Sequence, residues 1–153
     1  MYLENSKTII VKIGSSLIID DKKIIRKKWL LEFAKDIKAL RKKNKNIIIV
    51  SSGAIALGCK KLNIAKKKLK IDQSQAVASV GQIELMNLFK EVFAVQKINI
   101  SQILLTLEDT EIRRRAINAK RTIENLFNLN FIPIVNENDT IATSEIKYGD
   151  NDR

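Results

Sequence analysis

Four short segments of the chain combine glycine, hydroxyl, amide and charged residues, and the two segments that join glycine to serine suit the binding of anions. Glycine lets backbone N–H groups approach an anion closely, and a neighbouring lysine supplies a mobile ammonium for phosphoryl oxygens. Carboxylate and amide groups can hold the amino group of a zwitterionic substrate. Together these features favour phosphoryl transfer, in which positioning and charge stabilisation dominate. The segments are Lys12-Ile13-Gly14-Ser15-Ser16, Ser51-Ser52-Gly53-Ala54, Asn136-Glu137-Asn138-Asp139 and Gly149-Asp150-Asn151-Asp152.

Each segment also has an ordinary structural explanation. Gly14 to Ser16 is compatible with a plain turn, Ser51 to Gly53 with a helix N-cap, and Asn136 to Asp139 with a solvated turn. The last segment is compatible with a frayed polar tail. Lys12 is different, because it follows apolar residues in a run typical of a buried strand. Burial of an unpaired ammonium is costly, so we expect a functional role for Lys12.

The composition narrows the chemistry that is available to this chain. Its 153 residues include no histidine, which excludes His-based triads, HExxH zinc sites and histidine general bases. The single cysteine, Cys59, cannot form an internal disulfide and fits a reducing compartment. Neither GxxxxGK[ST] nor GxGxxG occurs, which disfavours a P-loop nucleotidase and a dinucleotide site.

The net charge of +11 is concentrated in the first half of the chain. Residues 1–70 carry 19 basic and 5 acidic side chains, whereas residues 71–153 carry 9 and 12. Most of the basic residues are lysines, so solvated helix faces explain the charge better than a nucleic-acid patch, which stays a remote alternative. No signal-peptide layout and no 18-residue apolar run occur, and we expect a soluble, cytoplasmic protein without membrane contact.

The hydrophobic pattern predicts strands that alternate with helices. Short β-branched apolar runs predict four buried strands, over residues 8–13, 46–50, 100–106 and 131–135, with a short extra strand over 145–148. Apolar residues at helical spacing predict helices over 24–43, 73–93 and 111–128, and the lysine-rich residues 60–70 read as a mobile surface connection. The predicted stripes are Trp29, Leu30, Phe33, Ile37 and Leu40 on the first helix and Ala76, Val77, Val80, Ile83, Met86, Phe89 and Phe93 on the second.

This alternation is typical of an α/β fold, with a mostly parallel sheet sandwiched by helices on both faces. In open sheets of this kind, ligands bind beyond the carboxyl ends of the strands. The first three of the four segments, and Thr106, follow strands directly. We therefore expect them to meet at one edge of the sheet.

Several blocks, taken in order from Lys7 to the last residue, resemble the glutamate 5-kinases of the amino acid kinase family. The blocks that carry the resemblance are Val11 to Ser16, Val50-Ser51-Ser52-Gly53-Ala54-Ile55-Ala56, Gln75 to Gln82, Gln102 to Thr106, and Ile132 to Asp139 followed by Gly149-Asp150-Asn151-Asp152. The resemblance implies ATP-dependent phosphorylation of the L-glutamate γ-carboxylate, the first step of proline synthesis, with Mg²⁺ accompanying ATP and proline as feedback inhibitor.

The resemblance also implies roles for individual residues. Lys12 is similar to the lysine that stabilises the transferring phosphoryl group, and Asp152 to the carboxylate that orients the catalytic lysines, with Asp150 in support. Phosphate contacts are implied for Gly14 and Ser15. Glutamate contacts are implied for Ser52, Gly53, Ala54, Asp139 and Asn151.

Members of this family continue well beyond the GDND block. The resemblance therefore implies that residues 1–153 are the N-terminal, glutamate-binding part of an amino acid kinase domain, without its ATP-binding half. We expect weak or absent activity for this chain alone, and a homo-oligomer for a full-length protein. Acetylglutamate, aspartate and uridylate kinases, which share the fold, are the nearest alternatives.

Overall fold

The computed structural model describes residues 2–65 and 69–142. Its four strands form one parallel sheet in the order β1-β2-β4-β3. They are β1 (Thr8–Ile13), β2 (Asn46–Ser51), β3 (Asn99–Leu105) and β4 (Phe131–Glu137). The four predicted strands and their parallel arrangement are confirmed, and the predicted bounds differ from these by at most two residues. The extra strand over 145–148 lies outside the described residues.

The helices connect the strands in the predicted alternation. Three short helices, α1 (Tyr2–Asn5), α2 (Ser15–Ile18) and α6 (Leu107–Glu111), accompany four longer ones. The longer helices are α3 (Lys27–Lys42), α4 (Ala54–Lys61), α5 (Ile71–Val95) and α7 (Arg113–Asn128). None of the described helices is both long and apolar enough to cross a membrane.

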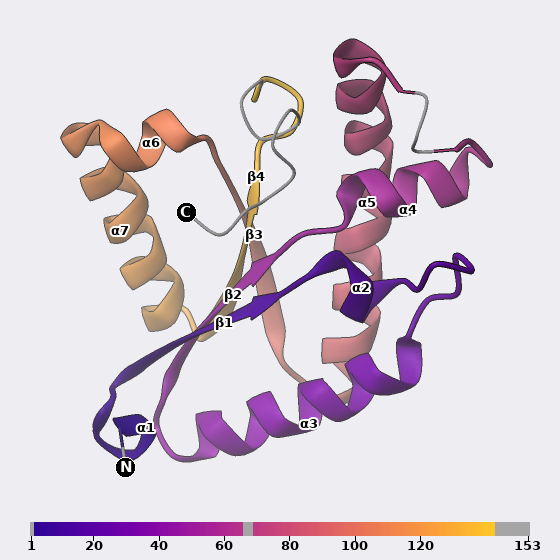
Figure 1. Cartoon of the computed structure of the whole chain (residues 1–153). Coiled ribbons are helices and arrows are strands. Elements are labelled where there is room, and N and C mark those ends of the chain that lie inside the picture. Colours follow the sequence, from indigo (N-terminus) through magenta and orange to yellow (C-terminus); the bar gives the residue numbers. More distant parts are fainter. Residues whose placement is uncertain (1, 66–68, 143–153) are drawn as a thin grey trace.

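The direction of each connection decides which face of the sheet a helix covers. The chain passes from β1 to β2 and then to β3 in one direction across the sheet, and returns from β3 to β4 in the other. Because crossovers between parallel strands are right-handed, a reversal of direction moves the connecting helix to the opposite face. Accordingly, α7 lies on one side of the sheet and α5 on the other (Figure 1).

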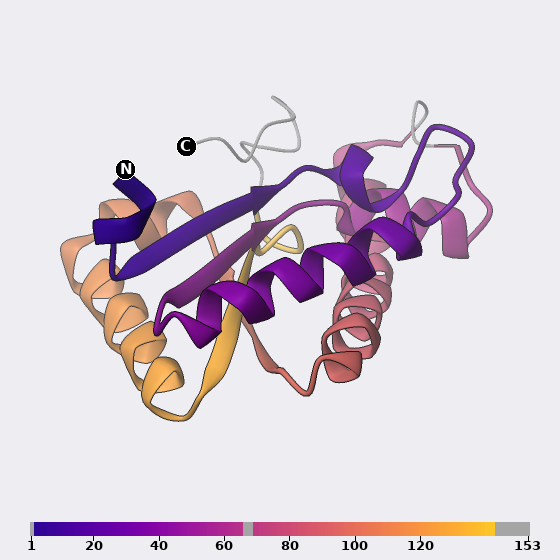
Figure 2. The ribbon, with the colours of Figure 1, turned by 90° about the horizontal axis from the view of Figure 1, so that it is seen from below.

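The hydrophobic core fills the space between the sheet and helices α3 and α5. Figure 2 shows α3 running along this side of the molecule, below β1 and β2. Alternate residues of the strands point into the core, as the period of two requires. Its fully buried members include Ile13, Ile47, Ile49, Ile132 and Ile134 from the sheet, Leu30 and Ile37 from α3, and Leu85, Phe89 and Phe93 from α5.

The opposite face of the sheet is covered over only part of its width. Helix α7 packs along β4, and none of its side chains is buried. Ile10 on β1 is 66% exposed on this face. Between α7 and the first two strands lies an open cavity of about 760 Å³, lined by Ile48, Ile123 and Phe127 among others. The prediction of cover on both faces therefore holds for the β3–β4 side but not for β1.

Two helix predictions and one predicted connection differ from the structure. The helix predicted from residue 24 begins at Lys27, because Ile25 forms a bridge with Ile19 and the N–H of Ile24 donates to the Asp20 carboxylate. The helix predicted over 111–128 is divided at Ile112, whose extended backbone separates α6 from α7. Helix α4 continues through Lys61, so the surface connection begins later than predicted.

The predicted helix stripes are only partly buried. On α5, Val77, Phe89 and Phe93 are buried as expected, but Ala76 and Ile83 are exposed. The buried face instead includes Ala78, Gly81, Leu85, Leu88 and Val92. A helix of 25 residues has many apolar positions, and spacing alone does not say which set faces the sheet. On α3, Leu30 and Ile37 are buried with Ala34, whereas Trp29 is 37% exposed.

Candidate active site

The carboxyl ends of β1 and β2 are held together by hydrogen bonds between the loops that follow them. Ile13 and Ser51 are the last pair in the register of these strands. One residue further, the backbone N–H of Ser52 donates to the carbonyl of Ile13 at 3.2 Å, and the Ser52 hydroxyl lies 3.5 Å from the same oxygen. The ladder is thus extended into the loops, which fixes Ser52 beside the start of the Gly14 loop.

Gly53 brings the two loops into contact through a backbone conformation that side chains disfavour. Its φ is +111°, in the left-handed region that favours glycine, and it is the N-cap of α4. A Cβ built on Gly53 would lie 3.6 Å from the Cα of Ser15. The structure therefore brings together Gly14, Ser15, Ser52, Gly53 and Ala54, as the sequence predicted.

Two glycines to which the sequence assigned no role fix α4 against α5. A Cβ on Gly81 would lie 1.7 Å from the carbonyl oxygen of Ala54, and one on Gly58 would lie 2.1 Å from that of Val77. These separations exclude any side chain, so the backbones of the two helices touch. Because Ala54 is the first residue of α4, this contact also fixes the position of the Ser52–Gly53 loop.

The last residues of β4 and the loop that follows them carry the third set of candidate residues. Asn136 is 3% exposed, and its Nδ2 donates to Oε1 of Gln82 at 2.8 Å. Within the described residues, its Oδ1 is buried and has no hydrogen-bond partner. The N–H of Asn138 donates to the carbonyl of Leu105 at 2.8 Å, which joins this loop to the end of β3. Asp139 is half-buried in the turn that follows.

Lys12 lies at the same edge of the sheet, but its burial was predicted wrongly. It is exposed and occupies the same face of β1 as Ile10. The reason is that, within the described residues, β1 lies at the edge of the sheet and α7 packs along β4 instead. Lys12 pairs with Val50 in the register of β1 and β2. Gly14 follows Lys12 by two residues along the chain, and Ser52 follows Val50 by two. Its position at the loops agrees with the prediction, whereas the cost of burial does not apply to it.

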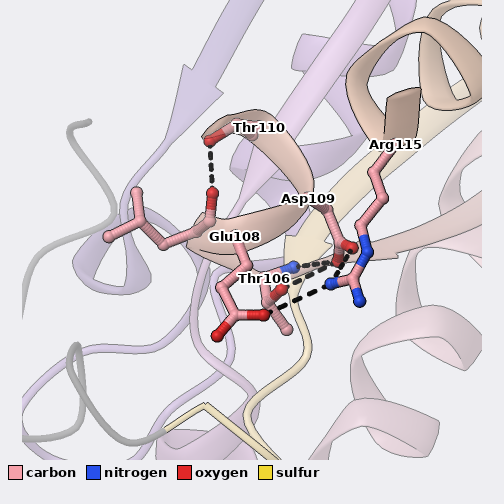
Figure 3. A network of polar contacts seen from close by, with 6 residues as sticks. Thr106, Glu108, Asp109, Thr110 and Arg115 are labelled. Atoms are coloured by element: carbon pink, nitrogen blue, oxygen red, sulfur yellow. Dashed lines mark hydrogen bonds and ion pairs between the residues drawn. The ribbon is translucent and has the colours of Figure 1, made fainter. Parts of the chain in front are cut away.

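A polar network that the sequence did not suggest lies directly after β3, around helix α6 (Figure 3). The backbone N–H and the hydroxyl of Thr106 both donate to Asp109 at 2.8 Å, and Arg115 contacts Asp109 and Glu108 at 3.3 Å. The hydrogen bonds from Thr106, followed by the charge of Arg115, hold the pKa of the Asp109 carboxyl below its usual range. The spacing Thr-x-x-Asp is a capping-box signature and could have located α6.

This network borders the loop that carries Asp139. A cavity of about 330 Å³ lies between them, lined by Thr106, Asp109, Arg115, Ile141 and Ala142 among others. The cavity joins the end of β3 to the β4 loop, and the carboxyl ends of all four parallel strands lie at this same edge of the sheet.

The remaining predicted site residues, Asp150, Asn151 and Asp152, lie outside the described residues. Among the described residues, no group of three His, Cys, Asp or Glu side chains could hold a metal ion.

The amino acid kinase family model matches residues 7–153. The chain belongs to the amino acid kinase family. Curated relatives within this family are named Glutamate 5-kinase. The protein from Pelagibacter ubique (strain HTCC1062) is 78% identical over all 153 residues, and that from Ruegeria sp. (strain TM1040) is 49% identical over 99% of this chain. The chain spans only 42% and 41% of the lengths of these two relatives.

Two solved structures share the fold. A carbamate kinase from Giardia superposes with a TM-score of 0.56 at 11% identity, over 86% of this chain and 60% of that protein. An isopentenyl phosphate kinase from T. acidophilum gives 0.54 at 10% identity, over 85% and 54%. The α/β fold with a parallel sheet, predicted from the sequence, is thereby confirmed as that of an amino acid kinase.

Proposed function

We propose that this chain forms the glutamate-binding part of a glutamate 5-kinase. The observation that carries the proposal is the convergence of three loops, after β1, β2 and β4, at one edge of the sheet. Relatives that are named Glutamate 5-kinase, at 49% and 78% identity, support the choice of substrate. The reaction transfers the terminal phosphoryl group of ATP to the γ-carboxylate of L-glutamate. A bond forms between a carboxylate oxygen and phosphorus, and the bond from phosphorus to the ADP oxygen breaks.

The phosphoryl group would lie at the β1 loop. The reaction brings two anions together, and the ammonium of Lys12 would reduce their repulsion. Phosphate oxygens can approach the backbone N–H groups closely at Gly14, because the space beside this residue is empty: a Cβ built there would have no neighbour within 4 Å. Ser15 adds a hydroxyl. ATP would bring Mg²⁺, whose contribution when bound is to neutralise phosphate charge.

The glutamate would lie between the β2 and β4 loops. Ser52, Gly53 and Ala54 offer a hydroxyl and backbone N–H groups, which bind carboxylates without adding negative charge. Asp139 is suited to the substrate ammonium. The Asn136 Oδ1 is a further acceptor for that ammonium, because a buried carbonyl oxygen without a partner gains a hydrogen bond when the ligand arrives. Asn151, Asp150 and Asp152 stay predicted contributors.

A chimaera tests the proposal. Residues 1–153 of this chain would replace the aligned segment of the Pelagibacter ubique kinase, and phosphorylation would be assayed with L-glutamate, N-acetyl-L-glutamate, L-aspartate and UMP as acceptors. We expect activity with L-glutamate alone. A chimaera that melts cooperatively but phosphorylates another acceptor, or none, would contradict the proposal. For residues 1–153 without the remaining segment, we expect little or no turnover. Proline added to the chimaera should inhibit it.

A further inference from the structure

Helix α5 contacts the chain on both sides of Asp139, and it does so with two glutamines. On the first side, Gln82 Oε1 accepts a hydrogen bond from Asn136 Nδ2 at 2.8 Å. On the other side, Gln75 Nε2 donates to the carbonyl of Ala142 at 3.3 Å. The loop is therefore tied to one helix on either side of Asp139.

The two glutamines are seven residues apart, so they lie on the same face of the helix, two turns from one another. That face is otherwise part of the contact between α5 and the rest of the protein, since Val77, Ala78 and Gly81 lie beside it and are buried. Asn136 and Ala142, the residues that the glutamines contact, are 3% and 7% exposed. The middle of the loop, at Thr140 and Ile141, is exposed.

Gln82 is itself oriented by a third amide. Its Nε2 donates to Oε1 of Gln102 on β3 at 3.2 Å. Because Nε2 of Gln82 is engaged by Gln102, Oε1 is the atom that Gln82 presents to Asn136. With Nδ2 engaged by Gln82, the oxygen Oδ1 is left as the acceptor without a partner among the described residues.

We propose that Gln75 and Gln82 are positioning residues, which hold the segment from Asn136, near the end of β4, to Ala142 in the conformation that binds substrate. Neither side chain needs to touch the substrate. Gln82 presents the Asn136 oxygen for a ligand ammonium, and Gln75 anchors the loop beyond Asp139. This inference rests on the proposed function, because it assigns the loop to the glutamate subsite.

Amide hydrogen exchange tests the positioning without any ligand. In chain 1–153, Gln75→Leu and Gln82→Leu should speed exchange in residues 138–142, because local opening follows the loss of the contacts that tie a loop down. The matched control is Asn87→Leu, which removes an exposed amide from the same helix, beside the start of β3. Unchanged loop exchange in both glutamine variants, or equal acceleration in the control, would overturn the proposal.

Substitutions to glutamate separate the two hydrogen-bond directions. At position 82 the partner is the Nδ2 donor of Asn136, so Gln82→Glu retains the bond and should restore slow exchange, and Gln102 can turn its own amide to donate. At position 75 the partner is a backbone carbonyl, which only accepts, so Gln75→Glu should be no better than Gln75→Leu. The reverse pattern, with rescue at 75 and none at 82, would overturn the assignment.

Calorimetric titration of L-glutamate into the same proteins connects the loop to binding. We expect Gln75→Leu and Gln82→Leu each to weaken glutamate binding roughly fivefold to tenfold, the loss of about one hydrogen bond. Gln82→Glu should bind as the unchanged chain does. If the unchanged chain fails to bind glutamate while the exchange pattern is as described, the proposed function fails and the positioning stands. Normal glutamate affinity in all variants would overturn the positioning instead.

Discussion

The backbone N–H of Ser52 donates to the carbonyl of Ile13 at 3.2 Å, and this bond joins the loop after β2 to the loop after β1. One loop carries the residues assigned to phosphate and the other those assigned to glutamate. The pair of strands therefore determines the distance between the two subsites before any ligand binds. Preorganisation of this kind lowers the cost of bringing two reactants together.

Gly53 should be sensitive to a single methyl group because of its backbone and not because of crowding. At φ +111° an alanine is strained, and we expect Gly53→Ala to lower the free energy of unfolding by about 1–2 kcal/mol. Urea denaturation of the chain measures this. The control is Gly14→Ala, because Gly14 has φ −72° and open space at its Cβ, and we expect a change within about 0.5 kcal/mol. Equal losses at both glycines would contradict the assignment.

Gly81 should be sensitive to an added methyl group because of crowding and not because of its backbone conformation. A Cβ there would lie 1.7 Å from the carbonyl oxygen of Ala54, so Gly81→Ala must separate α4 from α5. Overpacking of this kind costs about 1–3 kcal/mol, and here it should also weaken glutamate binding, since Ala54 begins the helix after the Ser52 loop. Ser79→Ala, at an exposed position on the same helix, should change neither quantity. A Gly81→Ala protein with unchanged stability and affinity would show that the helices are not in contact.

The Asp109 carboxylate should stabilise the protein only where it is ionised. Its pKa is lower in the folded chain than in the unfolded chain, so its contribution is complete above the unfolded value, near pH 4, and is lost as the pH falls through the folded value. Asp109→Asn should therefore be less stable than the unchanged chain at pH 7, and the difference should shrink on acidification below pH 4. Urea denaturation from pH 7 to 3 measures it. A difference that is constant across this range would contradict the assigned charge interaction.

Lys12, Ser52 and Asp139 should affect different kinetic constants in the chimaera. Loss of the Lys12 ammonium should lower kcat by about 10²–10³ with glutamate binding largely intact, because its charge acts on the transferring phosphoryl group. Asp139→Asn and Ser52→Ala should mainly raise KM for glutamate, the first by about tenfold or more, because it removes a charged hydrogen bond. Steady-state kinetics with each substrate varied gives the separation. Equal losses in kcat and affinity for all three would mean that the roles are wrong.

The sequence predicted the strands and the meeting of their loops well, because both depend on local pattern. Buried parallel strands are short β-branched runs. Because the strands are parallel, their carboxyl ends lie at the same edge of the sheet. The exposure of Lys12 was not predictable in this way. It depends on β1 lying at the edge of the sheet within the described residues and on α7 packing along β4 instead, and both follow from the order of strands, which no local pattern contains.

The contacts of Gln75 and Gln82 on α5 could not be predicted from the sequence either, because they also depend on how the elements pack. Gln75 and Gln82 lie within an apolar helix, and their spacing indicates a shared face but not what that face meets. Only the packing of α5 beside the end of β4 shows that both glutamines contact one loop. The break at Ile112 was hidden because no glycine or proline marks it, so the predicted helix joined α7 to Glu111, the last residue of α6.

The most direct test of the central claim is a calorimetric titration of L-glutamate into chain 1–153 and into its Asp139→Asn variant, with glutarate, which lacks the amino group, as the comparison ligand. We predict saturable binding of L-glutamate by the unchanged chain, weaker binding of glutarate, and a loss of this preference in Asp139→Asn. Absence of saturable glutamate binding, or equal affinity for the two ligands in both proteins, would contradict the assignment of this sheet edge to glutamate.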